Sequence, residues 1–287
     1  MKKLQFGALL LAITATLAVP VSASAQSKGK VLVVMSSAHE LELRDGKKYQ
    51  TGYYLNEFVV PYRKLRDAGY EPVIANPKGD TPVMDANSNN KMFFGNDDTA
   101  RAKALEYAQS IVQLKHPKTL ASVVTEGTKG YVGLFVPGGH APMADLIKDK
   151  DLGKILASFH DSKRPTGIIC HGPIVLLSAL PDSNAFVTSL VANDGKANSL
   201  ADNWPYKGYR MTVFSTGEEQ QLEGPNGLGG NVQFYPVNAL AEAGGHVDSA
   251  ANWHSNVVVD RELITAQQPM SAEEFGNVFV AKLKTRK

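Results

Sequence analysis

Short apolar runs alternate along this chain with segments in which apolar residues recur at helical spacing. Val31–Met35 is a continuous apolar run of the kind that forms a strand buried on both faces of a parallel sheet. Leu55–Ala68 has the spacing of an amphipathic helix that ends at Gly69, although Pro61 predicts a kink or a break in it. Tyr70–Ala75 predicts a second strand. Strand, helix and strand with short connections form the βαβ unit of a parallel sheet.

The rest of the chain continues this alternation. Pro82–Asp98 is polar and lacks periodicity, which predicts a long loop, and Thr99 or Asp98 is expected to cap the next helix. Further helices are expected at Thr99–Leu114, Met143–His160, Gly172–Leu180, Pro236–Ala243 and Ser271–Lys284. Further strands are expected at Tyr131–Val136, Arg164–Ile169, Tyr209–Phe214 and Asn256–Val259. This order predicts a doubly wound α/β fold, with helices on both faces of a mostly parallel sheet.

The N-terminus departs from this pattern. Lysines at positions 2 and 3 precede the almost wholly apolar stretch Leu4–Val21, and the small residues Ala23-Ser24-Ala25 follow. These three parts are typical of a secretory signal peptide, and the alternative, a membrane anchor, needs ~20 strongly apolar residues. We therefore expect residues 1–25 to be removed, residues 26–287 to form a single domain, and the mature protein to be periplasmic or secreted and free of the membrane.

Charge and cysteine content exclude several classes of function. The formal net charge is only +2, and no basic run with interleaved aromatic residues appears, so no nucleic-acid partner is expected. One cysteine is present, which excludes an intramolecular disulfide and a thiolate metal cluster. The histidines outside two glycine-rich turns show no metal-ligand spacing, so neither a metal nor another cofactor is expected.

Two glycine-rich turns follow predicted strands, at the end of the sheet where doubly wound proteins bind ligands. The second turn places Cys170 between a strand that ends at Ile169 and a helix that begins at Gly172. A sharp strand-to-helix turn that exposes one residue is the arrangement of a nucleophile elbow. The partial positive charge of the helix N-terminus is expected to lower the thiol pKa and yield a nucleophilic thiolate. The alternative is a buried cysteine that serves as a small apolar side chain.

The other turn and the histidine after the cysteine complete the candidate site. The backbone N–H groups of Gly138 and Gly139 are expected to face an oxyanion formed on an attacked carbonyl group, and His140 is expected to line the pocket. His171 is expected to act as a base that orients or moves protons. The alternative for His171 is an imidazole that binds a backbone carbonyl in the core.

Several segments together resemble a known family. Val136–His140 followed by Ile169–Pro173 resembles the ThiJ/PfpI superfamily, which has a flavodoxin-like fold related to class I glutamine amidotransferases. Thr51–Tyr62 is similar to the segment that carries the glutamate of that superfamily, Val73–Gly79 to its second strand and loop, and Val259–Pro269 to its last hairpin. The resemblance extends in order across essentially the whole mature chain and implies a flavodoxin-like α/β fold.

Within the superfamily, the long loop and the segment ending in Glu57 resemble the glutathione-independent glyoxalases and their chaperone-like relatives. The resemblance implies that Cys170, His171 and Glu57 work with a later acidic residue. Alignment without a gap favours Glu219 as that residue and leaves Glu218 as the alternative, whereas paired glutamates after a strand otherwise form a solvated turn. It also implies a lyase of the glyoxalase III or D-lactate dehydratase type, a small carbonyl substrate such as methylglyoxal, and a homodimer.

Other functions fit the same cysteine. One is a cysteine hydrolase such as a peptidase, amidase or deglycase, and another is a redox sensor or holdase chaperone. The late His254-Ser255-Asn256 lacks the His-x-Glu pair of glutamine amidotransferases, which argues against ammonia production from glutamine. An exported protein would not meet the main cellular supply of methylglyoxal, so the sequence leaves the substrate open.

Overall fold

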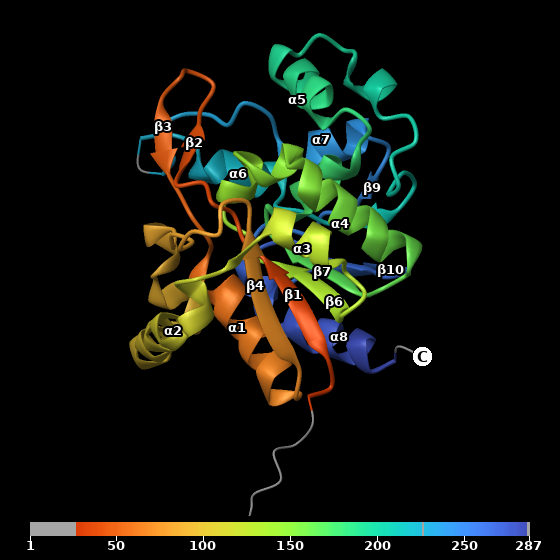
Figure 1. The fold of residues 1–287 in the computed structure, drawn as a ribbon. Coiled ribbons are helices and arrows are strands. Elements are labelled where there is room, and N and C mark those ends of the chain that lie inside the picture. The colour runs from red at the N-terminus through yellow and green to blue at the C-terminus, as the bar shows by residue number, and fades with distance from the viewer. Residues whose placement is uncertain (1–26, 226, 286–287) are drawn as a thin grey trace, which may run out of the picture.

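The central feature of the molecule is a mostly parallel sheet, shown in Figure 1. The computed structural model describes residues 27–225 and 227–285, so the expected signal peptide lies outside the described residues. Within them, the main sheet has seven strands in the order β10-β11-β7-β6-β1-β4-β5, and only the pair β10–β11 is antiparallel. The predicted doubly wound, flavodoxin-like α/β fold is confirmed.

The strands and helices follow one another along the chain much as the apolar pattern predicts. The strands of the main sheet are β1 Lys30–Val34, β4 Glu71–Asn76, β5 Lys118–Thr119, β6 Tyr131–Val136, β7 Thr166–Ile169, β10 Val257–Asp260 and β11 Leu263–Ala266. Two small sheets pair β2 Glu40–Glu42 with β3 Lys48–Gln50, and β8 Arg210–Met211 with β9 His246–Val247. The α-helices are α1 Leu55–Asp67, α2 Asp98–Ser110, α3 Leu120–Glu126, α4 Lys150–Asp161, α5 Ser183–Ala192, α6 Thr216–Leu222, α7 Pro236–Glu242 and α8 Ala272–Lys284.

Strand β1 shows why helices cover both faces of the sheet. Leu32 and Val34 pack into the core beneath α4, whereas Val31 and Val33 pack into the core beneath α1 and α8. All four side chains are fully buried, because alternate residues of a strand point to opposite faces and neither face of this strand is polar. Figure 1 shows α1, α2 and α8 along one face of the sheet, and α3 and α4 along the other.

Of the kink or break expected at Pro61, the break does not occur, since α1 continues through this residue as one helix. Pro61 is buried and lies against Gly276 of α8, so close that a Cβ atom on Gly276 would be 3.3 Å from the Cα atom of Pro61. A proline inside a helix costs about 3 kcal/mol. The packing of α1 on α8 offsets this cost.

Some predicted boundaries also shift. Helix α2 is capped by Asp97, whose carboxylate accepts hydrogen bonds from backbone N–H groups of the first turn, rather than by Thr99 or Asp98. The helix expected at Met143–His160 becomes two short 3₁₀ turns followed by α4, which Asp149 caps. Of the expected strand Tyr209–Phe214, only Arg210–Met211 is a strand, and it lies outside the main sheet.

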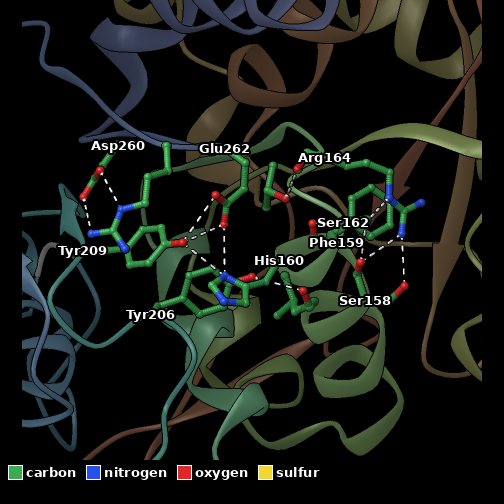
Figure 2. Close-up of polar contacts among 12 residues, drawn as sticks. Ser158, Phe159, His160, Ser162, Arg164, Tyr206, Tyr209, Asp260 and Glu262 are labelled. Atoms are coloured by element: carbon green, nitrogen blue, oxygen red, sulfur yellow. Dashed lines mark hydrogen bonds and ion pairs between the residues drawn. The ribbon is translucent and has the colours of Figure 1, made fainter. Parts of the chain in front are cut away.

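Polar side chains are paired with one another near the amino ends of β6, β7 and β11, as Figure 2 shows. Arg164 is 4% exposed and donates hydrogen bonds to main-chain oxygens that precede or begin β6. Beside it, the Tyr209 hydroxyl donates to the Glu262 carboxylate at 3.0 Å, and His160 Nδ1 lies 3.1 Å from the same carboxylate. These contacts hold the end of the sheet opposite the candidate site. None of the helices within residues 27–225 and 227–285 is long and apolar enough to cross a membrane.

Candidate functional site

Cys170 follows β7 directly and has a backbone conformation that few non-glycine residues adopt. Its φ is +64°, in the left-handed region, which costs on the order of 1 kcal/mol or more. Two hydrogen bonds hold this conformation: the Cys170 N–H donates to the Ala266 carbonyl at 2.8 Å, and the Cys170 carbonyl accepts from the Phe214 N–H at 2.9 Å. This strained turn between a strand and a helix has the geometry expected of a nucleophile elbow.

The expectation of a low thiol pKa is wrong for this site. Cys170 is 3% exposed, and burial followed by the charge of Glu57 raises its pKa well above the ordinary value. The N–H groups of Gly139 and His171 face the sulfur and lower its pKa, but they offset only part of the rise. The helix that follows, Gly172–Ala179, is a 3₁₀ helix rather than an α-helix. The thiol therefore holds its proton until a nearby base accepts it.

His171 is placed to be that base. Its Nδ1 lies 3.3 Å from the Cys170 sulfur, and its Nε2–H donates to Glu219 Oε2 at 2.6 Å. A carboxylate only accepts hydrogen bonds, so the proton of a neutral His171 resides on Nε2, and Nδ1 presents a lone pair to the thiol. Burial, and next the charge of His140, lower the pKa of His171 to about 4. His171 is thus neutral at neutral pH.

The structure decides between the two candidate glutamates in α6. Both are fully buried, so the alternative of a solvated turn is wrong. Only Glu219 reaches the imidazole of His171. Glu218 points elsewhere, because successive helix positions are ~100° apart. Its carboxylate accepts hydrogen bonds from Ser215 N at 3.0 Å, in a capping box, and from Trp253 N at 2.7 Å.

Glu57 lies in the first turn of α1 with its carboxyl group inside the protein. It is fully buried, and neither oxygen has a hydrogen-bond partner within the described residues. Burial raises the pKa of Glu57 to about 8, an effect that the facing Cys170 thiol and Gly138 N–H only partly offset. The three residues are so close that a Cβ atom on Gly138 would lie 2.4 Å from the Cys170 Cβ and 2.5 Å from Glu57 Oε2. Glu57 is therefore largely protonated at neutral pH and adjoins the thiol.

The turn after β6 contributes more than its backbone. Gly139 has φ +95°, and a Cβ atom there would lie 2.0 Å from the Gly52 carbonyl oxygen, so the turn requires glycine. The next residue, His140, does more than line a pocket: its Nε2–H donates to Glu219 Oε1 at 2.8 Å. Its ring lies 3.8 Å from that of His171, centroid to centroid. No spacing rule links His140 to Glu219, and the only available signal was that the two turns end adjacent strands.

Histidines and a carboxylate that are far apart in sequence thus form one cluster. Potential ligand atoms of His140, His171 and Glu219 lie within 4.8 Å of one another. Two histidines and a carboxylate are a ligand set that zinc accepts. In the structure each oxygen of the Glu219 carboxylate accepts a hydrogen bond from one of the two imidazoles.

The site is closed. The side chains of Cys170, His171, Glu57, Glu219 and His140 are each at most 3% exposed. Aromatic rings cover the two histidines, because Phe214 stacks on His171 at 4.4 Å and Tyr49 meets His140 edge-on at 5.7 Å. A ligand must therefore reach a thiol that is buried in this structure.

The sheet is mostly parallel and carries a buried cysteine on a strained turn, with a histidine and a carboxylate behind it. These features define an α/β protein with a cysteine at a nucleophile-elbow turn. A model of the DJ-1/PfpI family matches residues 49–204. The chain belongs to the DJ-1/PfpI family.

Comparison with individual proteins places named relatives beside this chain. The protein/nucleic acid deglycase HchA of Staphylococcus aureus is 25% identical over 260 residues, which cover 89% of this chain and 80% of that protein. The crystal structure of glyoxalase III from Candida albicans has a TM-score of 0.61 and 22% identity, over 88% of this chain and 97% of that one. A rapid encystment protein of Francisella tularensis has a TM-score of 0.64 and 24% identity, over 89% and 99% of the two chains. The two structural comparisons show a shared fold.

Proposed function

We propose that this protein is a glutathione-independent lyase of the glyoxalase type. Its substrate would be methylglyoxal or a related 2-oxoaldehyde, and its product the corresponding 2-hydroxy acid. Membership of the DJ-1/PfpI family and similarity to proteins named deglycase and glyoxalase III support chemistry on small carbonyl compounds. The buried elbow with its adjacent imidazole supports attack by a thiol.

The first step transfers the thiol proton of Cys170 to Nδ1 of His171 while the sulfur attacks the aldehyde carbon. The proton then passes to the aldehyde oxygen, which yields a neutral hemithioacetal and restores neutral His171. The 3.3 Å distance between sulfur and Nδ1 suits this transfer. The hydrogen bond from Nε2 to Glu219 fixes the ring and stabilises the imidazolium while it exists.

The observation that carries the proposal is the fully buried carboxyl group of Glu57 next to the thiol, neither oxygen of which has a hydrogen-bond partner within the described residues. Conversion of the hemithioacetal into a 2-hydroxy thioester moves hydrogen from one carbon to its neighbour, so a second proton-transfer group is needed. His171 removes the proton from the first carbon while Glu57 donates its proton to the oxygen on the second. His171 then returns a proton to the second carbon, and Glu57 takes back the hydroxyl proton of the first. Water hydrolyses the thioester and frees the thiol.

Hydrolysis of an amide or ester by a cysteine, in contrast, needs a base and an oxyanion site but no such shuttle. A deglycase activity is nevertheless a second candidate, because a protein named deglycase is 25% identical to this chain. It would begin with the same attack by the thiol on an adduct of methylglyoxal. A redox-sensing role fits the site poorly, because a buried thiol with a raised pKa is a slow target for oxidation.

The test is to incubate the purified protein with methylglyoxal in D₂O without glutathione and to follow lactate by NMR. Wild type should form lactate, and the deuterium content at its second carbon should show whether the moving hydrogen exchanges with solvent. Cys170→Ala should abolish lactate formation, and Glu57→Gln should lower kcat by about 10²–10⁴-fold. Glu106→Gln, which changes an exposed glutamate, is the matched control and should keep wild-type activity. Absence of lactate with wild type would overturn the proposal.

The deglycase candidate is separated by a second substrate. The adduct of methylglyoxal with an N-acetylated amino acid also dissociates spontaneously, so its loss alone is no evidence of deglycation. A true deglycase removes the adduct faster than this spontaneous dissociation. A glyoxalase consumes only the methylglyoxal that has already been released, and adduct loss then stays at the spontaneous rate.

A further inference from the structure

We propose that His140 is a positioning residue, which holds a positive charge beside Glu219 and so keeps His171 a neutral imidazole able to accept the proton of Cys170. The inference deepens the proposed function, on which it rests for the need to deprotonate the thiol. It assigns a role to His140, a buried polar residue behind the elbow that the proposed reaction does not use.

The geometry is that of one carboxylate shared by two imidazoles. Glu219 Oε1 accepts from His140 Nε2 at 2.8 Å, and Oε2 accepts from His171 Nε2 at 2.6 Å. Each imidazole thus uses its Nε2–H on a separate oxygen. Both rings and the carboxylate are almost fully buried, so water does not screen their charges.

Protonation of both imidazoles at once would be unfavourable. Their ring centroids are 3.8 Å apart, and two like charges at this distance inside a protein repel strongly. One carboxylate therefore pairs with one imidazolium, and the question is which ring carries the proton. The Nδ1 of His171 faces the Cys170 sulfur, so a proton there would compete with the thiol proton for the same space. This assigns the charge to His140.

The other charged and titratable groups around the cluster favour the same assignment. Burial lowers the pKa of His140, but the charge and hydrogen bond of Glu219, and next the charge of the nearby Asp85, outweigh it and raise this pKa. Tyr49 packs edge-on against His140 and donates its hydroxyl to Asp85 at 2.9 Å. On the His171 side lie Cys170 and Glu57, which hold protons at neutral pH. The neighbouring Glu218 carboxylate is engaged in the capping box of α6.

One contact opposes the assignment. Nδ1 of His140 has no hydrogen-bond partner within the described residues, and a buried N–H without an acceptor is unfavourable. The attraction of two nearby carboxylates outweighs this, and the net pKa of His140 is raised. The charge on His140 in turn lowers the pKa of His171. His171 thus remains an acceptor for the thiol proton over the whole neutral range.

The direct experiment measures the two histidines by NMR of ¹⁵N-labelled imidazole groups in the intact protein, without substrate. In wild type at pH 7 we expect His140 to be an imidazolium, and His171 to be neutral with its proton on Nε2. A neutral His140 at pH 7, or His171 protonated on Nδ1, would overturn the proposal. This readout does not require the protein to be a glyoxalase, and it needs no variant to fold.

The second arm removes the charge but keeps a hydrogen-bond donor, with His140→Gln. The pKa of His171 should rise by about 1–3 units, since a cation within ~4–6 Å has been lost. The acid limb of kcat/KM should move to higher pH by the same amount, and wild-type activity should largely return above pH 8. His116→Gln changes an exposed histidine outside the site. It is the matched control and should leave both the titration of His171 and the pH profile of kcat/KM unchanged.

The outcomes distinguish the inference from the proposed function. An unchanged His171 titration in folded His140→Gln overturns the inference even if lactate is formed normally. Loss of activity at every pH with an unchanged titration would show a purely structural role for His140, which also overturns it. Wild type that makes no lactate but shows charged His140 and neutral His171 would overturn the proposed function alone.

Discussion

Glu57 and Cys170 illustrate how burial, rather than chemical type, sets the behaviour of single residues in this protein. A glutamate and a cysteine placed side by side in water would ionise near their ordinary pKa values. Here both are removed from solvent, so both hold their protons well into the neutral range. The same burial acts in the opposite direction on His171, because its charged form is the protonated one. The site thus combines two proton donors with one neutral acceptor.

This pattern predicts how stability depends on pH. The pKa of Glu57 is raised from its ordinary 4.5 to about 8, so the folded state retains a proton that the unfolded chain loses. The contribution of Glu57 to stability is complete below pH 4.5 and disappears as the pH rises through 8. Between pH 5 and pH 8, the free energy of unfolding of wild type should fall by roughly 3 kcal/mol relative to Glu57→Gln. Urea denaturation of both proteins at the two pH values measures this, and parallel changes would contradict the raised pKa.

At the scale of elements, the site is made by two turns, the first turn of α1 and the short helix α6. The turns leave the carboxyl ends of the neighbouring strands β6 and β7, and their glycines allow the backbones to touch. Helix α6 then brings a carboxylate from a distant part of the chain behind the imidazoles. The spacing between these elements is small enough that a single methyl group is decisive.

Gly138→Ala tests that spacing. The added Cβ would lie 2.4 Å from the Cys170 Cβ and 2.5 Å from Glu57 Oε2, far inside van der Waals contact. We expect a loss of activity of at least about tenfold and a destabilisation of about 1–3 kcal/mol, because the elbow and the start of α1 must move apart. Gly130→Ala is the control, since a Cβ there meets nothing within 4 Å. Equal effects of the two substitutions on activity and on thermal unfolding would refute the close approach.

The two adjacent glutamates of α6 should separate stability from activity. Glu218→Gln leaves one acceptor oxygen where the carboxylate has two, so either the capping-box bond from the Ser215 N–H or the bond from the Trp253 N–H is lost. The protein should be destabilised by about 1–2 kcal/mol while its kcat stays near that of wild type. Glu219→Gln leaves the cap intact but removes the anion between the two imidazoles, so kcat should fall by about tenfold or more. Thermal unfolding and steady-state kinetics of the same two preparations provide the test. A large loss of kcat in Glu218→Gln together with a loss of stability alone in Glu219→Gln would contradict these two roles.

At the scale of the whole molecule, the sheet separates a structural end from a chemical end. Polar groups near the amino ends of the strands bind one another (Figure 2), whereas those beyond the carboxyl ends of β6 and β7 meet at the elbow. Helices cover both faces of the sheet, and the residues at the elbow are buried. In the proposed reaction, buried groups would exchange protons before water enters to hydrolyse the thioester.

We also propose that the protein is exported and that residues 1–25 are removed. Expression of the full chain in a bacterium with two membranes should yield mature protein whose first residue is Gln26, recovered in the periplasmic fraction. N-terminal sequencing and intact mass measure this. An uncleaved chain confined to the cytosol would contradict the proposal and would return cytosolic methylglyoxal to consideration as the substrate.

The order of strands and helices could be predicted from the sequence because each apolar run carries its own periodicity. β6 appears where Tyr131–Val136 predicts it, and the elbow appears at Cys170, since a glycine-rich turn after a buried strand is a local property. Local pattern fails where tertiary contacts dominate. Pro61 does not break α1, because α8 packs against it.

For the site, the sequence by itself identified Cys170, its neighbour His171 and the upstream Glu57 as candidates, because all three occur in recognisable local segments. Only the tertiary structure decided that Glu219 rather than Glu218 reaches His171, because two adjacent helix positions differ only in direction. It also decided that His140 shares this carboxylate and that the thiol keeps its proton. Both depend on how deeply several distant segments bury one another, and no local pattern of residues encodes that depth.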